Sequence, residues 1–145
     1  MIQKPIKNIT SSNFEKYGKI LEFSKEFEGH FEIIVRETLQ PWRLAVLRVR
    51  NRVSTFLENH PDSMESFEPV KGTTLLVVSE NHCPDNYEVF LLDKPVCLHK
   101  GIWHDVVALS DDILIRVAEN LEVSCEFYYF KDQLQPVMFQ GKALE

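Results

Sequence analysis

The sequence is poor in cysteine and has no long apolar segment. Its three cysteines, Cys83, Cys97 and Cys125, are odd in number and widely spaced, which argues against a disulfide framework and a CxxC zinc site. We expect reduced thiols, with Cys97 and Cys125 in strands. No apolar run approaches the ~20 residues of a membrane span, and residues 1–10 lack the apolar centre of a secretion signal. These absences predict a cytoplasmic protein that does not associate with membranes.

Positive charge is also scarce. The chain has 16 basic and 22 acidic residues, a formal net charge of -6, and no block of basic residues. Such a surface repels phosphate backbones, so we expect no nucleic-acid partner. With 145 residues, 44% of them hydrophobic, the chain is long enough to bury a core of its own, and we expect a single domain over residues 1–145.

Most of the chain reads as short strands. β-Branched and aromatic residues cluster in runs separated by Pro, Gly, Asn and Asp, which is typical of strands and turns. The runs expected to be strands are 31–38, 42–49, 73–79, 87–92, 96–99, 106–109, 113–117 and 123–130. Their number and spacing indicate an all-β sandwich or barrel. Apolar residues over 46–57 also fit helical spacing, so helix and strand both stay open there.

A short helix is expected near the N-terminus. Ser12 and Glu15 fit the S-x-x-E capping box, in which two side chains satisfy free backbone N–H groups. Gly18 follows three residues later and can end the turn.

The residues best suited to chemistry fall in two segments. In the first, Glu58 and His60 form an ExH pair, followed after four residues by Glu65. In the second, Gly101 precedes His104 in a Gly-x-x-His pattern. Alternate residues of a strand face the same side, so Glu58 and His60 can both point into a barrel while Glu65 returns from the next turn.

These side chains predict a divalent metal site. His60, Glu65 and His104 are the expected ligands, because imidazole nitrogens and carboxylate oxygens bind divalent cations and leave a position open for substrate. Nickel, manganese, zinc and iron all suit this ligand set. No organic cofactor is expected.

The amino-acid sequence around both segments resembles that of the ureidoglycolate lyase family of cupin proteins. Residues 58–61 read Glu-Asn-His-Pro, residues 67–72 read Phe-Glu-Pro-Val-Lys-Gly, and residues 98–104 read Leu-His-Lys-Gly-Ile-Trp-His. The similarity extends from about residue 10 to residue 130. It implies a cupin-type barrel (double-stranded β-helix or jelly roll), a homodimer, and cleavage of ureidoglycolate to glyoxylate and urea in allantoin degradation, a part of purine catabolism.

The chain departs from the family pattern near the expected site. The family has an Asp-Arg pair a few residues before a cysteine, where Ala118 and Glu119 precede Cys125, so both the acid and the cation are expected to be missing. Lys100 stands where the family usually has Arg. An ammonium group therefore replaces a guanidinium group that can donate two parallel hydrogen bonds to a carboxylate. The alternative function is therefore a diverged cupin that binds a small sugar or acid, or an isomerase without lyase activity. A plain interaction module is a third possibility.

The lyase reaction needs a base, an acid and a cation for the substrate carboxylate. Strand alternation argues against His99 and Lys100 sharing one pocket unless the turn at Gly101 reorients one of them. Trp103 should face away from His104 and serve in the core, with a pocket wall as its alternative role. The expected catalytic residues are His99, Lys100 and Glu58, and the expected binding residues for a small carboxylate substrate are Arg48, Trp103 and Arg116.

Overall fold

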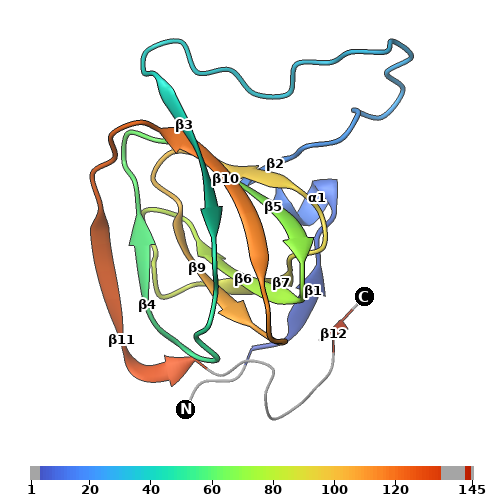
Figure 1. The fold of residues 1–145 in the computed structure, drawn as a ribbon. Coiled ribbons are helices and arrows are strands. Elements are labelled where there is room, and N and C mark those ends of the chain that lie inside the picture. Colours follow the sequence, from blue (N-terminus) through green and yellow to red (C-terminus); the bar gives the residue numbers. More distant parts are fainter. Residues whose placement is uncertain (1–3, 135–142, 145) are drawn as a thin grey trace.

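The computed structural model describes residues 4–134 and 143–144. Over these residues the chain is β-structure with one short helix (Figure 1). No helix of this part of the chain is long and apolar enough to cross a membrane. The elements are β1 (Ile6–Asn8), α1 (Ser11–Phe14), β2 (Gly18–Ile20), β3 (Trp42–Leu47), β4 (Ser54–Asn59), β5 (Glu65–Lys71), β6 (Thr74–Ser79), β7 (Glu88–Leu91), β8 (Val96–Leu98), β9 (Trp103–Ala108), β10 (Leu114–Asn120), β11 (Glu126–Leu134) and β12 (Ala143–Leu144).

The strands form two sheets that enclose the core. One sheet has the order β11-β4-β9-β6-β7-β1-β12 and the other the order β2-β8-β5-β10-β3. Phe67 and Val117 from the second sheet pack in one apolar cluster with Leu76 and Val106 from the first. The arrangement in Figure 1 confirms the expected all-β barrel.

Strand β6 is buried on both of its faces, between two apolar clusters. All six of its residues are buried. Leu76 and Val78 lie in the core between the sheets, whereas Leu75 and Val77 belong to a second cluster that contains Tyr87. Successive side chains of a strand point to opposite faces, so a strand that is covered on both faces is apolar throughout.

The predicted strand over 31–38 is wrong. In the structure these residues carry no strand assignment, and the side chains of Phe31 and Ile33 are 75% and 52% exposed. They belong to an excursion that leaves the barrel after β2 and returns at β3 (Figure 1). A strand needs a partner as well as a suitable sequence, and no described strand lies in register with this segment.

The helix considered over 46–57 is absent, and the range contains the end of β3, a connection over 48–53 and the start of β4. Strand β3 ends at Leu47 and β4 begins at Ser54, with no helix between them. Strand β5 was not predicted, and Glu65, expected in a turn, begins it; Pro69 lies within the strand. The proline is tolerated because β8 pairs only with Glu65, Ser66 and Phe67, so the backbone at residue 69 has a neighbour on one side only.

The N-terminal helix is present, but its cap differs from the prediction. Thr10 is the N-cap, and its hydroxyl accepts from the Asn13 N–H at 3.2 Å while the Asn13 side chain accepts from the Thr10 N–H at 2.9 Å. The capping box is therefore Thr10 with Asn13, and not Ser12 with Glu15. Gly18 belongs to β2 rather than to the end of the helix.

Gly18 is required by the close approach of β2 to β8. A Cβ at this position would lie 2.2 Å from the carbonyl oxygen of Cys97, a backbone atom. We predict that Gly18→Ala lowers the free energy of unfolding by about 2 kcal/mol or more, in the range of overpacked sites. Urea denaturation followed by circular dichroism measures it.

The matched control is Gly29→Ala. The added Cβ there would meet only the ring of Phe27, a side chain that can turn away. Equal losses of stability in the two variants would contradict the proposed backbone clash at Gly18.

Candidate metal centre

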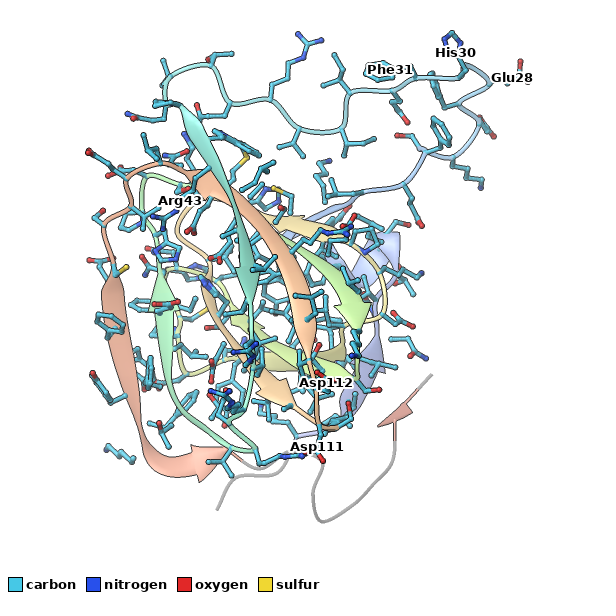
Figure 2. All side chains as sticks on the ribbon, in the orientation of Figure 1. Glu28, His30, Phe31, Arg43, Asp111 and Asp112 are labelled. Atoms are coloured by element: carbon cyan, nitrogen blue, oxygen red, sulfur yellow. The ribbon has the colours of Figure 1, made fainter. Side chains whose placement is uncertain are left out.

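The five-stranded sheet contributes two buried carboxylates and an arginine in one transverse row. Glu65 of β5 lies opposite Glu119 of β10, which lies opposite Arg43 of β3. Glu65 and Glu119 are 8% and 7% exposed. The Arg43 Nε donates to Glu119 Oε2 at 3.0 Å. Figure 2 shows Arg43 at the end of the barrel remote from Asp111 and Asp112.

The facing sheet contributes a carboxylate and two imidazoles. Glu58 of β4 lies opposite His104 of β9, and His60 directly follows the end of β4. Both histidines are buried, at 6% and 4% exposure, while the Glu58 side chain is 35% exposed. The predicted alternation thus holds, because Glu58 and His60 reach the same side of the strand.

The side chains from the two sheets meet in a compact cluster. Glu65 Oε1 lies 3.0 Å from His104 Nε2 and 3.2 Å from His60 Nε2. Glu58 Oε1 lies 3.7 Å from His104 Nε2 and 4.0 Å from His60 Nε2. Glu119 Oε1 is 3.9 Å from His60 Nε2. The structure therefore brings together the three residues predicted as metal ligands.

Backbone carbonyls orient both imidazoles. His104 Nδ1 lies 3.0 Å from the carbonyl oxygen of Ile102, and His60 Nδ1 lies 3.2 Å from that of Ser124. A carbonyl oxygen only accepts, so Nδ1 carries the proton in each ring. In the neutral rings, the free electron pair of each Nε2 then points to the centre of the cluster, as in histidines that ligate metals.

Burial and nearby opposite charges shift the pKa values of the clustered side chains in opposite directions. Burial alone would lower the pKa of His60 and His104, but the Glu65 carboxylate outweighs it and raises the pKa of both. For Glu65, burial would raise the pKa, yet the two imidazoles lower it. The cluster without a metal is therefore an ion-paired network built around an ionised Glu65.

The donor atoms fit a divalent cation. Among the described residues, Glu65 Oε1, Glu119 Oε1 and His104 Nε2 are buried and make no contact with hydrogen-bond geometry, although Glu65 Oε1 and His104 Nε2 lie only 3.0 Å apart. Two groups of candidate ligands, Glu58-His60-His104 and His60-Glu65-Glu119, each place their ligand atoms within 4.8 Å of one another. Ligands bound at about 2.0–2.2 Å lie roughly 3 Å apart, which matches the spacing around Glu65 Oε1.

A small cavity opens beside the cluster. Its volume is about 160 Å³, and its walls include Arg48, Glu58, Glu65, His104 and Asp105. This is below the ~300–1,000 Å³ of pockets for drug-sized molecules, so the cavity suits a small molecule. A larger cavity of about 560 Å³ lies between α1, β2 and residues 22–34 and includes none of the clustered residues.

A comparison with models of protein families shows which family the chain belongs to. The model of the ureidoglycolate lyase family matches residues 40–137. The chain belongs to this family. The match covers every residue of the cluster, from Arg43 to Glu119. No curated protein matches the chain.

Solved structures of low sequence identity are similar to parts of the chain. A variant of Bacillus subtilis oxalate decarboxylase is 13% identical with a TM-score of 0.45, over 62% of this chain and 24% of that chain. A dTDP sugar isomerase from Desulfovibrio desulfuricans is 13% identical with a TM-score of 0.45, over 72% and 73%. The vicilin of Solanum melongena is 18% identical with a TM-score of 0.47, over 83% and 36%. The chain spans about a quarter of the oxalate decarboxylase.

Two of the predicted catalytic residues point away from the cluster. His99 Nε2 lies 2.9 Å from the carbonyl oxygen of Glu15, beyond the end of α1. Lys100 Nζ pairs with Glu37 at 2.9 Å. The turn at Gly101 therefore turns neither side chain inward, and of the three predicted catalytic residues only Glu58 lies at the site.

Two of the predicted substrate-binding residues are also elsewhere. Trp103 donates from Nε1 to the carbonyl oxygen of Asn81 at 3.0 Å and packs on the second apolar cluster, as expected for a residue that alternates with His104. Arg116 pairs with Glu68 at 3.0 Å, and both side chains are exposed. Arg48 is the only one of the three predicted binding residues that lines the cavity.

The family's Asp-Arg pair is absent from positions 118 and 119, but an acid and a cation from neighbouring strands lie at the cluster. Glu119 faces the cluster, because β10 alternates and places Ala118 on the other side of the sheet, and its cation is Arg43 from the neighbouring strand. Sequence reasoning missed this pair because residues 43 and 119 become neighbours only through the β3–β10 register. The acid at position 119 was the available signal.

We predict that the purified protein binds about one equivalent of Mn²⁺, Ni²⁺ or Zn²⁺, and that His60→Ala with His104→Ala abolishes binding, since removing two of the nitrogen donors leaves too few ligands. Isothermal titration calorimetry after treatment with a chelator measures it.

The control is His99→Ala, which removes a half-buried imidazole outside the cluster. It should bind metal as the wild type does. Unchanged binding in the double variant would contradict the ligand assignment.

Proposed function

We propose that the protein is a metal-dependent lyase that cleaves ureidoglycolate to glyoxylate and urea, or that cleaves a similar small hydroxy or ureido acid. The observation that carries the proposal is the buried set His60, Glu65, His104 and Glu119 beside a cavity of about 160 Å³. Membership of the ureidoglycolate lyase family supports the lyase reaction over the alternative of a binding protein or isomerase.

The cation would be held by the imidazoles of His60 and His104 and the carboxylates of Glu65 and Glu119. Two nitrogen and two oxygen donors suit nickel, manganese, iron or zinc. A divalent ion bound there would act as a Lewis acid toward the oxygens of the substrate.

Glu58 is positioned to move the proton. Its carboxylate is partly exposed at the cavity, 3.7 Å from His104 Nε2. As the substrate hydroxyl transfers its proton to Glu58, the C=O bond of glyoxylate forms and the C–N bond to urea breaks. The departing nitrogen takes up the electron pair of that bond and receives the proton back. No water or oxidant is consumed.

Two arginines have separate tasks. Arg48 lines the cavity and can hold the carboxylate of the substrate through a charge-assisted hydrogen bond. Arg43 is bound to Glu119, so its task is to neutralise and orient that carboxylate. Arg48 is thereby the anchor for a substrate carboxylate.

The direct test is the release of glyoxylate from ureidoglycolate by the purified protein, with and without added divalent metal. We expect metal-dependent release by the wild type and by His99→Ala, and none by His60→Ala. Absence of release by the metal-loaded wild type would refute the proposed reaction.

We predict that Glu58→Gln lowers kcat by roughly 10²–10⁴-fold, the usual contribution of a general base, with little change in metal affinity. Steady-state kinetics together with metal titration measures both quantities. A kcat within twofold of the wild type would exclude Glu58 as the proton acceptor.

We predict that Arg48→Ala raises KM by roughly 10-fold or more, because a charge-assisted hydrogen bond contributes about 1.5–3 kcal/mol. The paired control is Arg116→Ala, which removes an exposed arginine that pairs with Glu68 and should leave KM within twofold. If the two variants behave alike, Arg48 does not bind the substrate.

A further inference from the structure

Three lysines line one cavity between β1, β7 and the turn after α1. The cavity has a volume of about 270 Å³, and its walls include Lys4, Lys7 and Lys16. Among the described residues that line it, Glu88 is the one acid, and none belongs to the cluster of candidate metal ligands. Three positive charges and one negative charge leave a formal excess of two positive charges, in a chain whose formal net charge is -6.

The pairing of β1 with β7 brings these side chains to one place. The two strands run parallel, with Lys7 opposite Phe90. Opposite residues share a face of the sheet, and so do residues two apart on one strand, so Lys7 shares its face with Glu88. The ring of Phe90 packs edge-on against Phe14 of α1, with centroids 5.2 Å apart. This contact holds the turn after α1, which carries Lys16, beside the same face.

Glu88 fixes two of the lysines and a tyrosine. Its Oε1 lies 2.5 Å from Lys7 Nζ, and its Oε2 lies 3.3 Å from Lys16 Nζ. The hydroxyl of the buried Tyr17 donates to the same carboxylate. Burial would raise the pKa of Glu88, but the hydrogen bonds from Lys7 and Tyr17 lower it. Glu88 is therefore ionised at neutral pH and neutralises one of the three lysines.

The ammonium groups keep donors for a further anion. An ammonium group has three N–H donors, and a contact with Glu88 uses one of them. The side chains of Lys7 and Lys16 are 39% and 47% exposed, so a solute can reach both. Lys4 Nζ lies 5.0 Å from the centre of the ring of Tyr87, a cation–π contact that leaves its positive charge in place.

We propose that this cavity binds a phosphate dianion, either as inorganic phosphate or as the phosphate group of a small ester. A phosphate group carries a charge of about −1.5 to −2 at pH 7, which matches the excess of positive charge in the lining. Its oxygens can accept from several ammonium groups at once, and lysine binds phosphate as a point charge. A monocarboxylate would neutralise only one of the two excess charges.

The size of the cavity limits the ligand. A volume of about 270 Å³ lies just below the ~300–1,000 Å³ of pockets for drug-sized molecules. Phosphate or a short ester therefore fits. A long polyanion would extend beyond the lysines onto a surface that is acidic on average, where it is repelled.

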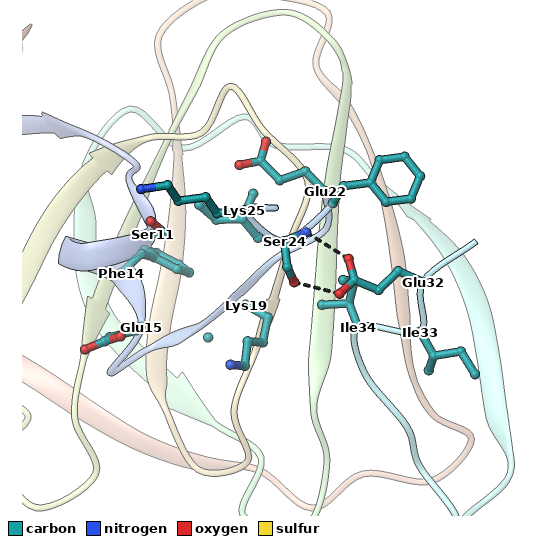
Figure 3. A pocket seen from close by; sticks show the side chains of 13 residues that line it. Ser11, Phe14, Glu15, Lys19, Glu22, Ser24, Lys25, Glu32, Ile33 and Ile34 are labelled. Carbon is teal, nitrogen blue, oxygen red and sulfur yellow. Dashed lines mark hydrogen bonds between the residues drawn. The ribbon is translucent and has the colours of Figure 1, made fainter. Parts of the chain in front are cut away.

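Charge distinguishes this cavity from the larger one of about 560 Å³. The larger cavity is lined by Lys19 and Lys25, but also by Glu15, Glu22 and Glu32 (Figure 3). Its described lining therefore has no excess of positive charge. Its two lysines provide a control in which the same number of charges is removed from another cavity.

The test is isothermal titration calorimetry of the full-length protein with inorganic phosphate, glycerol phosphate and acetate at low ionic strength, where charges are least screened. We expect about one equivalent of inorganic phosphate to bind, and acetate to bind more weakly by roughly 10-fold or more. Tighter binding of glycerol phosphate would support the ester as the ligand, and weaker binding would support the free anion.

Two variants should move the affinity in opposite directions. Lys7→Gln with Lys16→Gln removes two of the cations and should weaken phosphate binding by roughly 10-fold or more. Glu88→Gln removes the competing negative charge, keeps an acceptor for the Tyr17 hydroxyl, and should tighten phosphate binding. An ion cluster with a structural role alone would bind no phosphate in either variant. Circular dichroism and thermal unfolding establish that both variants fold.

The matched controls are Lys19→Gln with Lys25→Gln, which removes the same amount of charge from the larger cavity, and His60→Ala, which alters the candidate metal centre. Both should bind phosphate as the wild type does. The proposal is overturned if the wild type binds no phosphate, if the two lysine pairs have equal effects, or if His60→Ala abolishes binding.

Discussion

The structure of the site depends on one costly interaction, the burial of two carboxylates side by side. Glu65 and Glu119 lie opposite each other on adjacent strands, and both are nearly inaccessible to solvent. Buried ionised carboxylates are strongly destabilising unless opposite charge is close. His60, His104 and Arg43 supply that charge on three sides, and the carboxylate oxygens still without a partner give a cation a place to bind.

The barrel makes this arrangement rigid. The cluster residues belong to strands or follow directly after one, and their spacing is set by the ladders between those strands. The ring of Phe67 packs on His104 with centroids 5.7 Å apart, and carbonyl oxygens fix the proton on each imidazole. Ligands that are oriented before binding lose little entropy when the cation arrives, which is the condition for a well-defined metal centre.

The acid and the cation of this site come from two neighbouring strands. The acid is Glu119 and the cation is Arg43, and two N–H groups of Arg43 donate to the same oxygen, Glu119 Oε2. Because a sheet aligns side chains across strands as closely as along them, the β3–β10 register places the guanidinium of Arg43 against the carboxylate of Glu119, whose other oxygen faces His60.

The sequence by itself determined the all-β character, the positions of most strands and the residues able to bind a cation, because β-branched runs and an ExH pair are local signals. Glu58, His60, Glu65 and His104 were found in this way. Only the tertiary structure decided which side chains share a site, since this depends on register between distant strands. Four residues predicted for the site lie elsewhere in the structure: His99, Lys100, Trp103 and Arg116. Two residues that were not predicted, Glu119 and Arg43, lie at the cluster. The tertiary structure also left 31–38 without a strand partner, because strand propensity is local but strand pairing is not.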